Sequence, residues 1–248
     1  MTSQTAVTHS GDGSVRVAMW SGPRNISTAM MRAWENRPDT VVVDEPFYAA
    51  YLLATGIDHP GRDEVIASQP TSPPDVVAGL RAPVDAAVHY AKHMTHHLLP
   101  GQDLAWVADF RNVLLIRDPA EVVASYVRSR EACEPEDIGL LQQQHLADVL
   151  PDDTPVIDAG DFLRDPEAHL RWLCDWLGIE FTDRMLHWPA GPRDSDGVWA
   201  PYWYDAVVRS TGFEAWHPRE IDLSPHDAGV AETCRPAYDA LHARRLRL

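Results

Sequence analysis

The stretch VRVAMWSGPRNISTAMMRAWENR, residues 15–37, indicates a strand followed by a helix because its hydrophobic periodicity changes within a few residues. Residues 15–21 form a short apolar run rich in β-formers, and a Gly-Pro pair then marks a turn. After the turn, Met30, Met31 and Trp34 recur at helical spacing. The stretch therefore predicts a buried strand, a tight turn and a helix.

The same alternation of strand and helix continues along the chain. The apolar runs at 40–48, 86–93, 112–117 and 154–160 are further predicted strands. Asp118 and Asp165 are each followed by proline, as is typical of an N-cap and the first helical residue. Alternation of this kind implies right-handed crossovers. The predicted fold class is therefore α/β, with a central parallel sheet flanked by helices.

Composition narrows the classes of partner. The 248 residues carry a formal net charge of −16, which argues against nucleic acid because that partner needs a basic stripe. No apolar run is long enough to cross a bilayer, and the polar first dozen residues lack the hydrophobic region of a signal peptide. We therefore expect a disordered tail at 1–13, a single domain at 14–248, no membrane partner and a cytoplasmic protein.

Metal binding and disulfides are not expected. Cys133, Cys174 and Cys234 are odd in number and far apart, which favours free thiols in a reducing compartment. His93 and His97 have the i, i+4 spacing that can bind a metal on a helix, but no third ligand is evident nearby. The sequence therefore predicts no metal site.

The turn after the first strand has the features of an anion site. A helix N-terminus offers unpaired backbone N–H groups and a favourable dipole. Arg24 adds a full positive charge, and Asn25, Ser27 and Thr28 add hydrogen-bond donors. The loop lacks the Gly-Lys pair of ATP-binding loops. The alternative interpretation is a capped turn that binds no ligand.

A second strand end carries a similar signal. Arg117 ends the predicted strand at 112–117, and Ser125 lies eight residues further on, in the next predicted helix. Ligands of open α/β sheets collect at the carboxyl ends of strands, so two such ends suit a ligand with two separated phosphates. The alternative is that Arg117 only pairs with Asp118 or a neighbouring carboxylate.

Taken in order, these motifs resemble those of sulfotransferases that use 3′-phosphoadenosine 5′-phosphosulfate (PAPS). GPRNIST (22–28) is similar to their 5′-phosphosulfate loop, although Ile26 stands in place of the loop glycine and Asn25 in place of a serine. LLIRDPAEVVASY (114–126) is similar to their 3′-phosphate motif, and residues 163–181 resemble the helix that follows. The C-terminal glycine-containing segment of the eukaryotic cytosolic enzymes is absent.

The resemblance implies a three-layer P-loop-type fold and transfer of a sulfonate group from PAPS to a hydroxyl or amine of a small-molecule acceptor. Adenosine 3′,5′-bisphosphate (PAP) would be the product, and no metal would be needed. The residues that the resemblance implies for holding the donor are Arg24, Asn25, Ser27 and Thr28 at the 5′-phosphosulfate and Arg117 and Ser125 at the 3′-phosphate.

Sulfonate transfer also needs a base for the acceptor's proton. The resemblance favours Glu45, at the end of the second strand, over Asp44; alternatively these carboxylates cap a turn or pair with Arg24. Lys92 is expected to face the reacting sulfonate, unless it only buries its stem. His93 is the second candidate base, and otherwise lines the acceptor pocket with the neighbouring histidines.

Two other functions remain open at this point. A P-loop phosphotransferase would need Mg²⁺ and a loop lysine, for which Arg24 is a poor replacement. A catalytically silent nucleotide-binding protein is suggested by Ile26 in the loop. Residues 55–85 are predicted to be partly irregular. Residues 49–85 and the aromatic-rich residues 188–216 are expected to shape the acceptor pocket.

Overall fold

The computed structural model describes residues 13–128, 132–218 and 220–248. The predicted tail therefore lies, except for Gly13, outside the described residues. Within the described part of the chain, no helix combines the length and apolar character that crossing a bilayer requires. The three cysteines are buried and free, as predicted.

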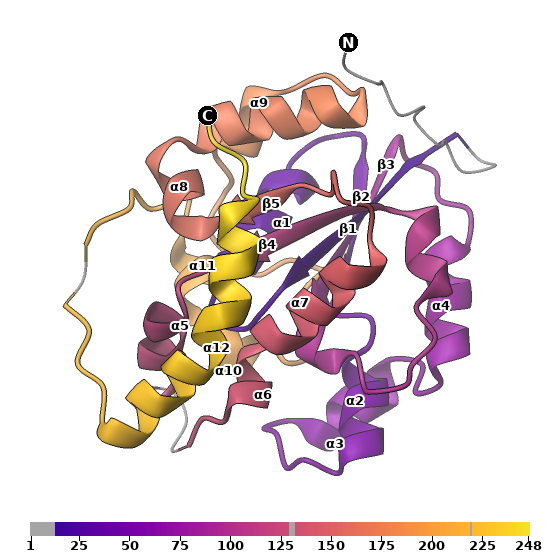
Figure 1. The fold of residues 1–248 in the computed structure, drawn as a ribbon. Coiled ribbons are helices and arrows are strands. Elements are labelled where there is room, and N and C mark those ends of the chain that lie inside the picture. Colours follow the sequence, from indigo (N-terminus) through magenta and orange to yellow (C-terminus); the bar gives the residue numbers. More distant parts are fainter. Residues whose placement is uncertain (1–12, 129–131, 219) are drawn as a thin grey trace.

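The centre of the molecule is a parallel sheet (Figure 1). Among the described residues it has five strands in the order β2-β3-β1-β4-β5, and every pairing is parallel. The strands are β1 (Val15–Ser21), β2 (Thr40–Asp44), β3 (Val88–Met94), β4 (Arg111–Ile116) and β5 (Val156–Asp158). This order puts β1 in the middle, with β3 on one side and β4 on the other.

Helices connect the strands and continue to the C-terminal end of the chain. They are α1 (Ser27–Glu35), α2 (Tyr48–Thr55), α3 (Arg62–Ser68), α4 (Pro73–Arg81), α5 (Pro119–Tyr126), α6 (Pro135–Ile138), α7 (Leu140–Val149), α8 (Ala159–Arg164), α9 (Pro166–Leu177), α10 (Ala200–Trp203), α11 (Asp205–Arg209) and α12 (Pro225–Ala243). Short 3₁₀ turns lie at Thr95–His97, Ala105–Asp109 and Asp183–Met185.

The helices cover both faces of the sheet. Because side chains alternate along a strand, Ala18 and Trp20 of β1 face one side and Val17 and Met19 the other. The first pair packs in a core with α5, α7 and α12, and the second in a core with α1 and α9 (Figure 1). The predicted three-layer α/β fold is confirmed.

Local signals for two helices are also confirmed. The Asp118 carboxylate accepts a hydrogen bond from the backbone N–H of Ala120 and caps α5. Asp165 caps α9 through the N–H of Ala168, and Gly178, with a φ of 71°, ends that helix.

Two stretches differ from the sequence prediction. The stretch 55–85 contains α3 and α4, whose apolar residues are too few to give a clear helical period. The strand predicted at 40–48 ends at Asp44, because Glu45 adopts a left-handed φ of 42° that cannot continue a strand. This turn directs the chain from β2 into α2.

Candidate functional site

The carboxyl ends of the strands open onto a cavity of about 590 Å³. Two groups of its lining residues differ in chemistry. The cationic half consists of Arg24, Ser27, Thr28, Arg117, Ser125 and Arg128. The aromatic half consists of Glu45, Tyr48, His59, His96, His97, Tyr202, Trp203 and Tyr204. Strand order explains the division, because Glu45 follows β2 and the two inner histidines follow β3, whereas Arg117 follows β4 across the central strand.

The turn between β1 and α1 forms the floor of the cationic half. Arg24 has a left-handed φ of 54°, whereas Ile26 has an ordinary φ of −86° that needs no glycine. The Asn25 amide donates to the backbone oxygen of Leu115, and its own oxygen accepts from the N–H of Ile26. In the described structure no side chain caps α1, and no acidic residue occupies its first turn. The helix N-terminus therefore presents its N–H groups to the cavity.

The two predicted anion-binding elements are joined by hydrogen bonds. Arg24 Nε donates to Ser125 Oγ at 3.1 Å, and Arg117 Nη1 donates to the backbone oxygen of Arg24 at 3.0 Å. Arg117 Nε also donates to Glu121 Oε2 at 2.8 Å, so the alternative ion pair predicted for Arg117 does form, with Glu121. Arg117 therefore holds the turn that carries Arg24 while remaining at the cavity wall.

Positive charge accumulates in this half of the cavity. Burial, together with the neighbouring Arg128 and Arg117, lowers the pKa of Arg24. Glu121 also lines the cavity, and its carboxylate contacts Arg117. In a chain with a net charge of −16, Arg24, Arg117 and Arg128 line the same cavity and give it a local positive charge, which favours an anion.

The aromatic half rests on a buried ion cluster. The Lys92 side chain has no solvent exposure, and its Nζ lies 2.8 Å from Asp44 Oδ1 and 2.7 Å from Glu45 Oε1. Lys92 also donates to the hydroxyl of Tyr204, which in turn donates to Asp44 Oδ2 at 2.7 Å. Glu45 and Tyr204 line the cavity, while Lys92 and Asp44 lie behind them.

The charges of this cluster follow from burial and pairing. Burial raises the pKa of Glu45 above its ordinary value; Lys92 opposes the shift and Asp44 adds to it. Burial alone would lower the pKa of Lys92, but Asp44 and Glu45 together raise it. Lys92 is therefore a firmly protonated partner of the two carboxylates.

The structure separates His93 from the other predicted site residues. Along β3, Lys92 and Met94 face one side of the sheet and His93 the other, where its ring stacks on Trp20 at 4.1 Å. His93 is buried and does not line the cavity. Burial and nearby His89 lower its pKa to about 3, so it is neutral.

His96 and His97 take the place at the cavity that was considered for His93. The ring of His97 stacks on Tyr48 and on Tyr51, with 4.8 Å between centroids in each case. Burial lowers the pKa of His96 to about 3 and that of His97 well below its ordinary value. Both histidines are therefore neutral, polar walls of the aromatic half.

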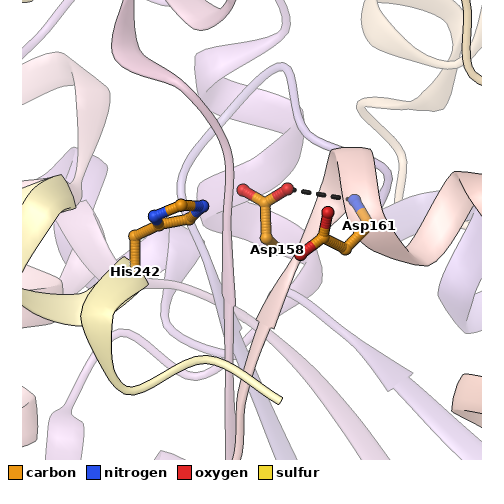
Figure 2. Close-up of side chains that lie close together, drawn as sticks. All are labelled: Asp158, Asp161 and His242. Carbon is orange, nitrogen blue, oxygen red and sulfur yellow. Dashed lines mark hydrogen bonds between the residues drawn. The ribbon is translucent and has the colours of Figure 1, made fainter. Parts of the chain in front are cut away.

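A group of acidic and histidine side chains with metal-ligand chemistry lies outside the cavity lining. Among the described residues, the grouping found is Asp158, Asp161 and His242, close together in Figure 2. Its carboxylates already have partners: Asp158 caps α8 and accepts from Tyr238, and Asp161 Oδ2 pairs with Arg245 at 2.7 Å. The group therefore fixes the end of α12 to α8, and Arg245 supplies the positive charge there.

Sequence reasoning missed the role of Tyr204 and the contribution of Arg128. Tyr204 belongs to the aromatic-rich stretch 188–216, which was predicted only as a possible pocket wall. Its hydroxyl donates to the Asp44 carboxylate, 160 residues away in the chain, and no local sequence signal indicates such a contact. Arg128 lies three residues after Ser125, so helical spacing could have placed it beside that serine.

Comparison with known proteins gives the family. The family model described as "Sulfotransferase domain" matches residues 15–245, so the chain belongs to the sulfotransferase domain family. A solved sulfotransferase of Alicyclobacillus acidocaldarius is similar in fold, with a TM-score of 0.54, 14% identity and coverage of 93% of this chain and 96% of that one. The sulfotransferase domain of the curacin biosynthetic pathway has a TM-score of 0.53, 16% identity and coverage of 90% and 98%.

Two curated relatives carry a different name. Branched-chain-amino-acid aminotransferase-like proteins 1 and 2 of Arabidopsis thaliana are 39% and 36% identical to this chain over 233 and 231 residues. Each match covers 90% of this chain, but only 41% and 40% of the respective relative. The chain therefore spans about two-fifths of the length of these relatives.

Proposed function

We propose that this sulfotransferase-family protein transfers the sulfonate group of PAPS to an acceptor hydroxyl or amine, with Glu45 as the general base. The observation that carries the proposal is the division of one cavity into a cationic half and a half containing a buried carboxylate. An anionic donor and an acceptor that must lose a proton need these two environments side by side.

The cationic half fits the donor's two phosphate positions. The uncapped N-terminus of α1, with Ser27 and Thr28, offers donors for the 5′-phosphosulfate. Arg117 and Ser125 are the proposed partners of the 3′-phosphate. Because Arg24 bonds to Ser125, we place Arg24 between the two positions, and Asn25 holds the turn through its bond to Leu115.

On the acceptor side, Glu45 is the proposed base because its carboxylate lines the cavity. When bound, PAPS supplies the activated sulfonate: the acceptor oxygen forms a bond to sulfur, and the bond from sulfur to the 5′-phosphate oxygen breaks. Glu45 takes the acceptor's proton, and the electron pair of the broken bond leaves with PAP. The acceptor is thereby sulfated with atoms and charges in balance.

Lys92 has a positioning role in this proposal. Its ammonium contacts both Asp44 and Glu45 and does not line the cavity, so it fixes the direction of the Glu45 carboxylate. His93 receives no catalytic role, because its ring packs against Trp20 on the opposite side of β3.

Isothermal titration calorimetry tests the donor assignment. PAP should bind at least about tenfold more tightly than ATP, because PAP alone carries phosphates at both expected positions. Equal or tighter binding of ATP would contradict the proposal, and Mg²⁺-dependent ATP turnover would establish a phosphotransferase instead. If the protein binds PAP but transfers no sulfonate from labelled PAPS to any acceptor, it is a catalytically silent nucleotide-binding protein.

The name of the two Arabidopsis relatives suggests transamination as a second function. An aminotransferase lysine attacks its cofactor as an unprotonated amine. Lys92 is the chain's single lysine, and two carboxylates keep it protonated. We infer that the aminotransferase name belongs to the part of those relatives outside the match. Absorbance titration with pyridoxal phosphate should show no Schiff base; formation of one at Lys92 would contradict this inference.

A further inference from the structure

The aromatic half of the cavity also restricts the acceptor. Its walls are rings: Tyr48 and His97 are nearly parallel, at 8° between planes, and Trp199 meets Tyr48 edge to face from behind. Tyr202 and Trp203 come from α10, and Tyr202 packs against Gly61 before α3. Ring faces of this kind favour a flat, apolar body.

The charge of this half is negative. Glu45 places its carboxylate at the cavity wall, and Asp205, which directly follows Tyr204, also lines the cavity. The cation that contacts Glu45, Lys92, is already bonded to Asp44, Glu45 and Tyr204. Burial keeps His96 and His97 neutral, so neither supplies positive charge near neutral pH. An anionic group on the acceptor would therefore face a carboxylate without a free cation beside it.

The arginines of the cavity do not remedy this. Arg24 follows β1, Arg117 follows β4 and Arg128 follows α5, whereas Glu45 follows β2 at the edge of the sheet. The donor phosphates would neutralise these arginines. Arg209 lines the cavity from the end of α11, where it is exposed to solvent. A solvated guanidinium contributes about 0.2–1 kcal/mol to holding a charged group, which is at most about fivefold in affinity.

Two neutral histidines at the cavity wall have polar atoms without a partner in the described part of the chain. The Nδ1 atoms of His96 and His97 are buried and have no hydrogen-bond partner within the described residues. Buried polar atoms without partners favour a ligand that supplies them with a donor or an acceptor. Neutral imidazole can do either, depending on its tautomer.

We propose that the acceptor is a hydroxylated compound with a flat, apolar body and no negative charge, bound against the rings of the aromatic half. This rests on the proposed function, because it takes Glu45 as the base and the cationic half as the donor site. The acceptor site should discriminate against anions because the positive charge of the cavity lies in the cationic half, where the donor binds, and the acceptor binds in the aromatic half.

Three probes with one body test the proposal: para-hydroxyphenylacetamide, tyramine and para-hydroxyphenylacetate. Each is titrated calorimetrically into the protein saturated with PAP, so that binding is measured without turnover. The neutral amide and the cationic amine should each bind at least about tenfold more tightly than the carboxylate. Equal or tighter binding of the carboxylate, or binding of none of the three, would overturn the proposal.

A pair of variants tests whether charge is the reason. Tyr202 is 49% exposed, so its replacement should not disturb folding. Tyr202→Lys should bind the carboxylate probe about two- to fivefold more tightly than the neutral control Tyr202→Gln. Equal affinity of the two variants for the carboxylate probe would exclude charge as the reason for its weak binding. Titration with PAP alone is done first: its failure speaks against the donor site and the proposed function, whereas PAP binding with the wrong probe order speaks against this inference alone.

Discussion

The ammonium of Lys92 lies 2.7 Å from Oε1 of Glu45, a residue 47 positions earlier in the chain. Register brings them together: Asp44, the last residue of β2, pairs with Lys92 of β3, and the left-handed turn at Glu45 directs its carboxylate back toward the lysine. The sheet thus places a cavity-lining carboxylate against a fixed, buried positive charge.

Replacing Lys92 should destabilise the fold strongly. Lys92→Met would leave Asp44 and Glu45 buried side by side without their cation, which typically costs about 3–5 kcal/mol. Urea denaturation measures the free energy of unfolding. The control Arg171→Met removes a half-exposed pair with Glu167 and should cost under about 1 kcal/mol. Equal losses in the two variants would contradict a buried, structural ion pair.

The rate should rise with pH through the pKa of Glu45. Burial raises that pKa above the ordinary glutamate value, so the base form is reached at higher pH than for an exposed glutamate. The same shift means that Glu45 favours the folded state most at low pH and less as pH rises through its folded pKa. A profile of kcat/KM against pH should show an acidic limb above about pH 4.5. His96, with a pKa of about 3, should not produce that limb; a limb that persists in Glu45→Gln would exclude Glu45 as its source.

Tyr204→Phe should move the acidic limb to higher pH. The Tyr204 hydroxyl hydrogen-bonds Glu45 at 3.3 Å and lowers its pKa, so losing the hydroxyl should raise that pKa further. The matched control is Tyr238→Phe, which removes a tyrosine hydroxyl bonded to Asp158 outside the cavity lining. We expect the control to keep the wild-type midpoint. An unchanged midpoint in Tyr204→Phe would show that this hydroxyl does not influence Glu45.

Arg117→Ala should weaken PAP binding by about 1.5–3 kcal/mol, the usual effect of losing a hydrogen bond to a charged group. Adenosine 5′-monophosphate lacks the 3′-phosphate, so its affinity should change much less in the same calorimetric titration. Arg111 begins β4 at the opposite end of that strand, where its guanidinium lies over Trp176, and Arg111→Ala serves as the control. Equal losses of affinity for both ligands would contradict the assignment of Arg117 to the 3′-phosphate.

Local sequence signals predicted much of the fold. The predicted strand at 15–21 coincides with β1, and Asp118, Asp165 and Gly178 cap the helices they were expected to cap. These succeed because strand periodicity, N-caps and left-handed C-caps depend on residues close in sequence. Helices α3 and α4 were missed because each buries few apolar side chains and so lacks a periodic stripe.

The sequence predicted which residues line the cavity better than it predicted which side chains contact one another. Glu45, Arg24 and Arg117 line one cavity because parallel strands all end at the same edge of the sheet. The direction of a side chain at a strand end depends on register and alternation, which send Lys92 to the carboxylates and His93 to Trp20. The chemical roles of these residues stay predictions.

Wild-type protein and Glu45→Gln are compared in two measurements on the same preparation: affinity for PAP and transfer of labelled sulfonate from PAPS to the best-bound hydroxylated probe. Glutamine keeps the shape of the side chain but cannot accept the proton. PAP affinity should change by less than about threefold, while the transfer rate should fall by roughly two to four orders of magnitude, the usual contribution of a general base. Transfer by Glu45→Gln at a near-normal rate would contradict the assignment of Glu45 as the base.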